Sequence, residues 1–336
     1  MESKNTHHYE FAGFLFGHSD AVTSIVAGHS TGNDYEDTVL VSGSRDKTLI
    51  IWNLSQKNAE SHFGEPQRCL TGHNHFVTDL DITQDNIHVI SSSWDKTLRL
   101  WDLRYAKCTR KFIGHEKEAE TVCFSNDNCR IFSAGHQKSL ALWNVRGQMK
   151  AESENDFNHR QWVTKVRYSA SSKNEYYATV GRDGRLKIWT GNLKCNASIK
   201  AHENYINALA LSLNGQYIVT GGKDNSVKVW DYNDLSKPHV EYKTESEVNA
   251  LAFNLQYQLV AAATDKSIKI WDIMNKKGEP LMNIEPEAVP ADEETSRYKG
   301  AQVRNTSIAW SANQKKLYVG CSDGHIRVYN ILFSSG

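Results

Sequence analysis

The sequence lacks the features that mark membrane, secreted and metal-binding proteins. None of its apolar runs approaches the roughly 18 residues needed to span a bilayer, and its N-terminal MESKNTHHYE has no apolar core of a secretory signal. Its six cysteines include no C-x-x-C pair, which predicts reduced, mostly buried thiols instead of a zinc site or disulfides. The 39 basic and 39 acidic residues cancel. We therefore expect a soluble, cytoplasmic globular protein without a metal, a cofactor or a membrane partner.

The motifs of common enzyme classes are also missing. There is no glycine loop suited to phosphates and no H-E-x-x-H sequence. Gly28–Gly32 fits G-x-S-x-G, but a nucleophile elbow needs a helix after the serine, and a polar loop follows here. We expect neither an enzymatic activity nor a small-molecule substrate.

What the sequence has instead is a repeat, which is clearest in Leu70–Asp102. This stretch opens with Gly-His, closes with Trp-Asp, and holds three segments that alternate apolar and polar residues, Val77–Ile82, His88–Ser92 and Thr97–Trp101. Such alternation predicts strands, because successive side chains of a strand point to opposite faces. The closing aromatic recurs seven times, at Trp52, Trp101, Trp143, Trp189, Trp230, Trp271 and Tyr329.

Other positions keep a fixed offset from this aromatic residue. An acid stands six residues before it in six repeats, and Gln137 replaces the acid in the third. A hydroxyl residue stands ten before it in the first five repeats, and a histidine lies upstream in the same five. The complete sets of four are His18, Ser42, Asp46 and Trp52; His73, Ser91, Asp95 and Trp101; His159, Thr179, Asp183 and Trp189; and His202, Thr220, Asp224 and Trp230.

Each set resembles a catalytic triad, but its repetition favours a structural role. The aspartate can accept a hydrogen bond from the histidine, which in turn bonds the hydroxyl that meets the Trp N–H. Each such bond stabilises by roughly 0.5–1.5 kcal/mol, and leaving a buried member unpaired costs more.

The repeats predict an all-β fold, a seven-bladed β-propeller in which residues 1–336 form one ring. A single sheet cannot bury both of its faces, so neighbouring sheets must pack together. The last repeat has only three strands, and residues 9–15 should supply its missing outer strand and so close the ring. Three segments lengthen the repeats: 28–37, 146–158 and the acidic 285–303.

Basic residues gather in the first two repeats. In the turn of the first repeat, Asp46 must point inward to its set of four, which leaves Arg45 and Lys47 on the outer surface. Two cations on a rigid turn are well placed to meet phosphates. A charged exposed turn is also common in proteins without such a partner.

Several stretches resemble the family of receptors for activated protein kinase C, which are WD40-repeat scaffolds of the small ribosomal subunit. They are SRDKTLIIW (44–52), GHNHFVTDL (72–80), SWDKTLRLWDL (93–103), GGKDNSVKVWD (221–231) and SIKIWDI (267–273). The resemblance covers all seven repeats. It implies a non-enzymatic scaffold on the head of the 40S subunit that contacts 18S rRNA and ribosomal proteins and docks protein kinase C and other signalling proteins in translation regulation.

The resemblance also assigns roles to residues. It places rRNA contacts on Arg45 and Lys47, with Arg68 and Lys96 as neighbours. It places partner contacts on Tyr242 and Tyr257, and kinase binding on 267–273, including Ser267 and Lys269. Apolar residues alternate in this last stretch, however, which favours the interior of a blade.

Two other classes share the repeat. A G-protein β subunit is expected to carry a long N-terminal coiled-coil helix, whereas only a few residues precede the first predicted strand here. A generic WD40 adaptor for ubiquitin ligases or chromatin, which does not bind the ribosome, remains the alternative.

Overall fold

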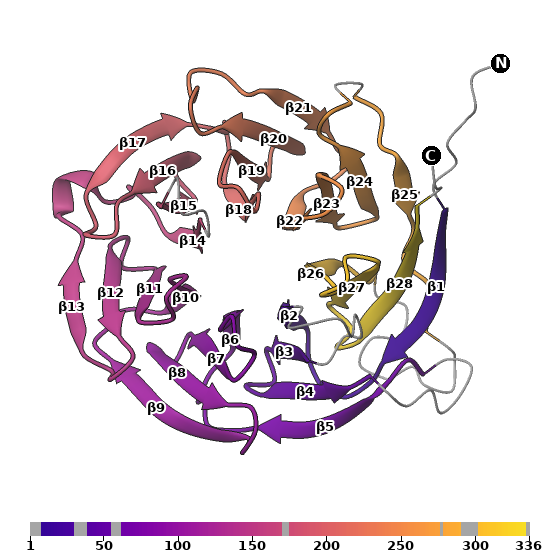
Figure 1. Cartoon of the computed structure of the whole chain (residues 1–336), viewed down its shortest axis with the longest axis horizontal. Coiled ribbons are helices and arrows are strands. Elements are labelled where there is room, and N and C mark those ends of the chain that lie inside the picture. Colours follow the sequence, from indigo (N-terminus) through magenta and orange to yellow (C-terminus); the bar gives the residue numbers. More distant parts are fainter. Residues whose placement is uncertain are drawn as a thin grey trace.

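The computed structural model describes residues 8–29, 39–54, 62–169, 175–275, 278–289 and 302–333. Within these residues, seven antiparallel four-stranded sheets stand as blades around a central axis (Figure 1). The prediction of an all-β, seven-bladed propeller is therefore confirmed.

Blades 1 to 4 follow one another along the chain, each running from its inner to its outer strand. Blade 1 contains β2 (Val22–Ala27), β3 (Leu40–Ser44), β4 (Leu49–Asn53) and β5 (Glu65–Leu70). Blade 2 contains β6 (Val77–Ile82), β7 (His88–Ser93), β8 (Thr97–Asp102) and β9 (Lys107–Ile113). Blade 3 contains β10 (Ala119–Phe124), β11 (Arg130–Gly135), β12 (Leu140–Asn144) and β13 (Met149–Glu152). Blade 4 contains β14 (Val163–Tyr168), β15 (Tyr177–Gly181), β16 (Arg185–Trp189) and β17 (Cys195–Lys200).

Blades 5 and 6 repeat this order, and blade 7 draws on both ends of the sequence. Blade 5 contains β18 (Ile206–Leu211), β19 (Tyr217–Gly222), β20 (Ser226–Asp231) and β21 (Val240–Lys243). Blade 6 contains β22 (Val248–Asn254), β23 (Leu259–Thr264), β24 (Ile268–Asp272) and β25 (Met282–Ile284). Blade 7 contains β26 (Asn305–Trp310), β27 (Lys316–Cys321), β28 (Ile326–Leu332) and β1 (His8–Leu15). A short 3-10 helix, η1 (Asn155–Phe157), precedes blade 4.

The ring closes as predicted, because β1 is the outer strand of blade 7. It pairs antiparallel with β28, with Tyr9 opposite Ile331 and Leu15 opposite Ile326. Figure 1 shows the two strands, indigo and yellow, side by side. Pairing with the first strand of the chain covers the edge that β28 would otherwise expose, and β1 becomes the outer strand of the blade.

The hydrophobic core is divided into seven clusters, and each cluster lies between two neighbouring blades. One cluster joins Val227 of blade 5 to Val260 of blade 6, and another joins Leu49 of blade 1 to Leu80 of blade 2. The three inner strands of a blade bury alternating residues against one or the other neighbour, whereas outer strands such as β5 and β9 are largely exposed. The ring is thus needed to complete every core.

A second set of contacts links the blades around the channel. The second residue of the inner strand donates a side-chain hydrogen bond to the first inner-strand residue of the next blade. Thr23 bonds the carbonyl of Val77 at 2.7 Å, and Thr306 bonds that of Val22 and so closes the circle. The other donors in this position are Thr78, Thr164, Asn207 and Asn249. Blade 3 has Glu120 there, and an ionised carboxylate cannot donate.

Some sequence expectations need correction. Residues 146–158 are not only a link, because they contain the outer strand β13 and η1. The cysteines are free, as expected, but only Cys123 and Cys321 are fully buried. Most of 28–37 and of the acidic 285–303 lies outside the described residues, as does the serine of the G-x-S-x-G match.

Candidate partner-binding surface

The four complete sets of polar residues are assembled inside their blades. In blade 2, His73 Nδ1 lies 2.9 Å from Asp95, and its Nε2 lies 2.7 Å from Ser91 Oγ. Trp101 Nε1 donates to the same hydroxyl at 2.8 Å. The corresponding contacts in blades 1, 4 and 5 have distances of 2.8–3.1 Å. Because the hydroxyl is buried and already bonded to two side chains, it has no access to a substrate.

Burial and hydrogen bonding fix the charges of these sets. Burial opposes the ionisation of Asp46, but the hydrogen bond and charge of His18 and the bonds from Thr48 together outweigh it and lower the pKa of the carboxyl to about 2. Burial lowers the pKa of His73, although Asp95 acts in the other direction. The sets of blades 2, 4 and 5 therefore hold an ionised aspartate beside a neutral histidine at neutral pH.

The third blade keeps the geometry without the acid. Gln137 Oε1 lies 2.9 Å from His115 Nδ1, so the amide oxygen takes the place of the carboxylate. His115 Nε2 still meets Ser133, and Trp143 still donates to that hydroxyl. An amide suffices because the position requires an acceptor, not a charge.

Four predicted RNA-binding cations lie at the surface of blades 1 and 2. Arg45, Lys47, Arg68 and Lys96 are all exposed, and none makes an ion pair within the described residues. Arg45 lies over the ring of Phe76, 5.6 Å from its centroid. Lys47 and Lys96 occupy the same turn position, with positive φ angles of 74° and 67°. Blades 4 and 7 have Gly184 and Gly324 there.

Three of the predicted partner-contacting residues are buried. Tyr242 is fully buried and stacks on Trp271 with ring centroids 5.0 Å apart. Ser267 and Lys269 are only 5% and 7% exposed. Tyr242 packs between blades 5 and 6, and Ser267 and Lys269 lie within blade 6, so their burial disfavours the predicted partner contacts. Tyr257 is exposed and lies against Phe333, so it stays a prediction.

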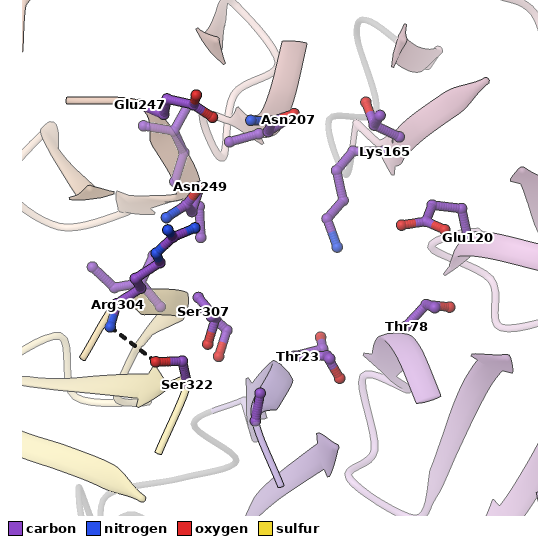
Figure 2. Close-up of a pocket in the computed structure, with 18 of the residues that line it drawn as sticks. Thr23, Thr78, Glu120, Lys165, Asn207, Glu247, Asn249, Arg304, Ser307 and Ser322 are labelled. Atoms are coloured by element: carbon purple, nitrogen blue, oxygen red, sulfur yellow. Dashed lines mark hydrogen bonds between the residues drawn. The ribbon is translucent and has the colours of Figure 1, made fainter. Parts of the chain in front are cut away.

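The central channel opens into a cavity of about 780 Å³ (Figure 2). Inner-strand residues such as Thr23, Thr78 and Asn249 line it together with Lys165 and Glu120, which both point inward. Charged and amide groups therefore surround a concave space to which all seven blades contribute.

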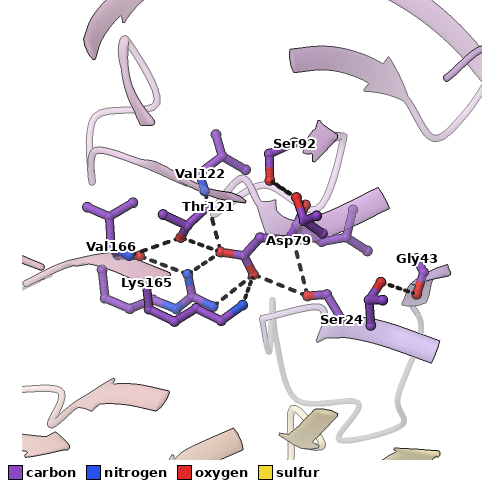
Figure 3. Close-up of polar contacts among 12 residues, drawn as sticks. Ser24, Gly43, Asp79, Ser92, Thr121, Val122, Lys165 and Val166 are labelled. Carbon is purple, nitrogen blue, oxygen red and sulfur yellow. Dashed lines mark hydrogen bonds and ion pairs between the residues drawn. The ribbon is translucent and has the colours of Figure 1, made fainter. Parts of the chain in front are cut away.

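A buried ion-pair network stands behind one side of this channel (Figure 3). Asp79 of β6 is fully buried and accepts from Lys165 at 2.9 Å and from Arg167 at 2.8 and 3.1 Å, both on β14. Thr121 of β10 and Ser24 of β2 also donate to Asp79. Burial opposes the charge, but the two cations hold the pKa of Asp79 well below its usual range. One carboxylate thus ties together blades 1 to 4.

Sequence reasoning missed an arc of stacked side chains at the channel mouth. We call it the aromatic arc; it contains Phe76, Trp94, His136, Trp162, Arg182 and Tyr205. Each of these residues stands at one of two fixed places in a repeat. It lies either three residues after the repeat's histidine or one residue before the position that the acid usually occupies. Backbone bonds such as Arg182 N–H to the Trp162 carbonyl hold the two kinds of loop together on one face. The fixed offsets were a signal available from the sequence.

The described residues also bear on metal binding and on membrane insertion. No group of three or more His, Cys, Asp or Glu side chains in this part of the chain is placed to hold a metal ion. None of its helices is long and apolar enough to cross a membrane.

These features define a seven-bladed β-propeller built on repeated His–Ser/Thr–Trp–Asp sets. The chain belongs to the WD domain, G-beta repeat family, whose repeat matches residues 9–53, 64–102, 106–144, 153–190, 193–231, 236–272 and 295–330.

Similar proteins match nearly the whole chain. Small ribosomal subunit protein RACK1 of Caenorhabditis elegans is 38% identical over 325 residues, 96% of each chain. Small ribosomal subunit protein RACK1 of Drosophila melanogaster is 36% identical over 327 residues, 97% of this chain and 98% of the relative. Cross-pathway control WD-repeat protein 2 of Flammulina velutipes is 38% identical over 322 residues, 96% and 97% of the two chains. The chain belongs to the family of these relatives, which confirms the resemblance found in the sequence.

Proposed function

We propose that this chain is a non-enzymatic, cytoplasmic scaffold of the small ribosomal subunit, formed as one propeller over residues 1–336. Its exposed cations Arg45, Lys47, Arg68 and Lys96 bind 18S rRNA. Other surfaces bind ribosomal proteins and signalling proteins such as protein kinase C. Relatives whose names place them in the small ribosomal subunit support this proposal, since they match over almost their full length.

The observation that carries the RNA contact is that lysine holds this left-handed turn position in blades 1 to 3, at Lys47, Lys96 and Lys138, of which the first two belong to the predicted set. A side chain with a Cβ costs roughly 1–2 kcal/mol in this conformation, which glycine adopts freely. Blades 4 and 7 use glycine there, so backbone geometry does not explain Lys47 and Lys96. Both are exposed and free of ion pairs within the described residues, as phosphate-binding cations should be.

Co-sedimentation with purified small ribosomal subunits over a salt series tests the proposal. Wild-type binding should weaken steeply with salt, because each neutralised phosphate releases counterions. The double variant Arg45→Asp, Lys47→Glu should lose binding and keep its unfolding midpoint. The matched control is Arg146→Asp, Lys150→Glu, which makes the same charge change on two exposed residues of blade 3.

Two results would contradict this assignment. If the Arg45, Lys47 variant still co-sediments, these two residues do not form the RNA contact. If the wild type does not bind the subunit at all, the generic WD40 adaptor becomes the better reading.

A further inference from the structure

Glu120 is the exception in the circle of hydrogen bonds that joins the blades. Its six counterparts each donate to the next blade, whereas Glu120 accepts from Trp94 Nε1 at 2.8 Å and faces His136 Nε2 at 3.5 Å. This exchange gives up the contact with the next blade that the counterparts of Glu120 make. In return, the carboxylate fixes two members of the aromatic arc.

The arc holds Arg182 rigidly at the channel mouth. The Arg182 guanidinium lies 4.1 Å over Trp162 and 5.5 Å over Tyr205. His136 stacks on Trp162 at 3.7 Å with an interplanar angle of 17°. A guanidinium packed over aromatic rings still carries its planar set of N–H donors, which suits a carboxylate.

The described residues that line the mouth include more cations than acids. Among the described residues that line the cavity, Arg45, Arg182 and Arg304 make no ion pair. The other cations are engaged, Lys165 and Arg167 by Asp79 and Lys223 by Glu247 at 3.2 Å. Of the acids, Glu120 and Asp265 already accept hydrogen bonds from Trp94 and Asn249. An anionic partner therefore complements this mouth.

The stacking also decides which kind of anion fits. His136 and Arg182 lie within about 4 Å of the Trp162 ring centre and must cover opposite faces, so no base can stack there. Single-stranded nucleic acid usually binds by base stacking on open aromatic faces. The arginines line a concave space, which an extended peptide can enter with its side chains.

We propose that the aromatic arc, with Arg182 as its anion-binding residue, docks an acidic peptide segment of a partner protein. Glu120 is a positioning residue that sets Trp94 and His136. Arg182 lies in the turn between β15 and β16 of blade 4, whereas Lys47 lies in the turn between β3 and β4 of blade 1, so the two functions can be separated by mutation of these two residues.

Fluorescence polarisation with a labelled peptide of alternating Glu and Ser tests the proposal. The wild type should bind it saturably, and at least about tenfold more tightly than the matched Gln–Ser peptide. Arg182→Glu should weaken binding of the acidic peptide by about tenfold or more, whereas the same change at exposed Arg146 should leave it unaltered. Equal binding of the two peptides, or an unaffected Arg182→Glu variant, would overturn the proposal.

Variants of Glu120 test whether this residue positions the aromatic arc for binding or only stabilises the fold. Glu120→Thr restores a donor to the blade circle but removes the acceptor for Trp94, so we expect an unchanged or higher unfolding midpoint and weaker peptide binding. Glu120→Gln keeps an acceptor and should retain binding. If Glu120→Thr binds as the wild type does, Glu120 does not position the arc.

Two further measurements separate the partners. Arg182→Glu should still co-sediment with ribosomal subunits, and Lys47→Glu, which leaves Arg45 of the cavity lining in place, should still bind the acidic peptide. An oligouridine RNA serves as the third probe. If Arg182→Glu abolishes binding of that RNA and spares the peptide, the partner is nucleic acid and the proposal fails.

Discussion

Blades 2 to 4 and blades 6 and 7 reach the same four-stranded geometry by different chemistry. The inner strands of blades 2 and 4 carry Asp79, Asp81, Lys165 and Arg167, which meet in the network behind the channel. At the same two positions the inner strand of blade 6 has Ala250 and Ala252. Polar contacts therefore link the blades on one side of the ring, and small apolar side chains pack on the other.

The same division appears in the sets around the closing aromatic. In blade 6 Ala261 replaces the hydroxyl, Trp271 Nε1 has no partner in the described part of the chain, and Tyr242 stacks on its ring. In blade 7 Asp323 pairs with buried Arg327 at 2.9 Å. Stacking and an ion pair thus replace the histidine and its hydroxyl, so the repeat tolerates several solutions with one shape.

The largest expected effect comes from breaking the ion pair of blade 7. Arg327 is 1% exposed and also donates to the Glu287 carbonyl at 2.8 Å. Arg327→Met leaves Asp323 charged and buried, which should lower the free energy of unfolding in urea by about 3–5 kcal/mol. The double variant Arg327→Met, Asp323→Asn should recover much of this loss. A double variant as unstable as the single one would mean that packing of the Arg327 side chain matters more than its charge.

A somewhat smaller loss is expected from a hydroxyl in blade 2. Ser91→Ala leaves both His73 Nε2 and Trp101 Nε1 without their shared partner, which should lower the free energy of unfolding by about 2–4 kcal/mol. Ser91→Thr is the matched control, since blades 4 and 5 use Thr179 and Thr220 in this position. A Ser91→Ala loss below that of Ser91→Thr would show that the set adds little to stability.

The charged side of the channel should also respond to pH. Burial raises the pKa of Asp81 to about 6, against 3.8 normally, although Arg167 opposes this. The folded state then holds a proton that the unfolded chain has released, so the contribution of Asp81 to stability falls as pH rises from about 4 through 6. Asp81→Asn removes this dependence and keeps an acceptor for the Phe124 N–H. The free energy of unfolding of Asp81→Asn minus that of the wild type, measured in urea, should therefore rise by roughly 2 kcal/mol from pH 4 to pH 7. An equal difference at both pH values would contradict the raised pKa.

The ring and its polar sets were predictable from sequence because they follow from fixed offsets. The offset from Trp101 to Asp95 and Ser91 recurs in other repeats, and each set closes within one blade. The Asp79 network was not predicted, because it joins residues 86 and 88 positions apart on different blades. The burial of Tyr242 was not predicted for a similar reason, because it depends on Trp271, which lies on a strand of the neighbouring blade.

The smallest expected effect comes from giving blade 6 the hydroxyl that it lacks. Ala261→Ser places a hydroxyl ten residues before Trp271, as in blades 1 to 5. This hydroxyl can accept the hydrogen bond of the Trp271 Nε1–H, which has no partner among the described residues. No histidine of blade 6 stands ready to accept the new O–H, so the gain of one bond is offset by a second unpaired group. We expect the free energy of unfolding to change by less than about 1 kcal/mol in either direction. A gain of several kcal/mol would mean that the Trp–hydroxyl bond stabilises a blade without its histidine. A comparable loss would mean that the Tyr242–Trp271 stack has closed the space that the hydroxyl needs, and that blade 6 depends on packing alone.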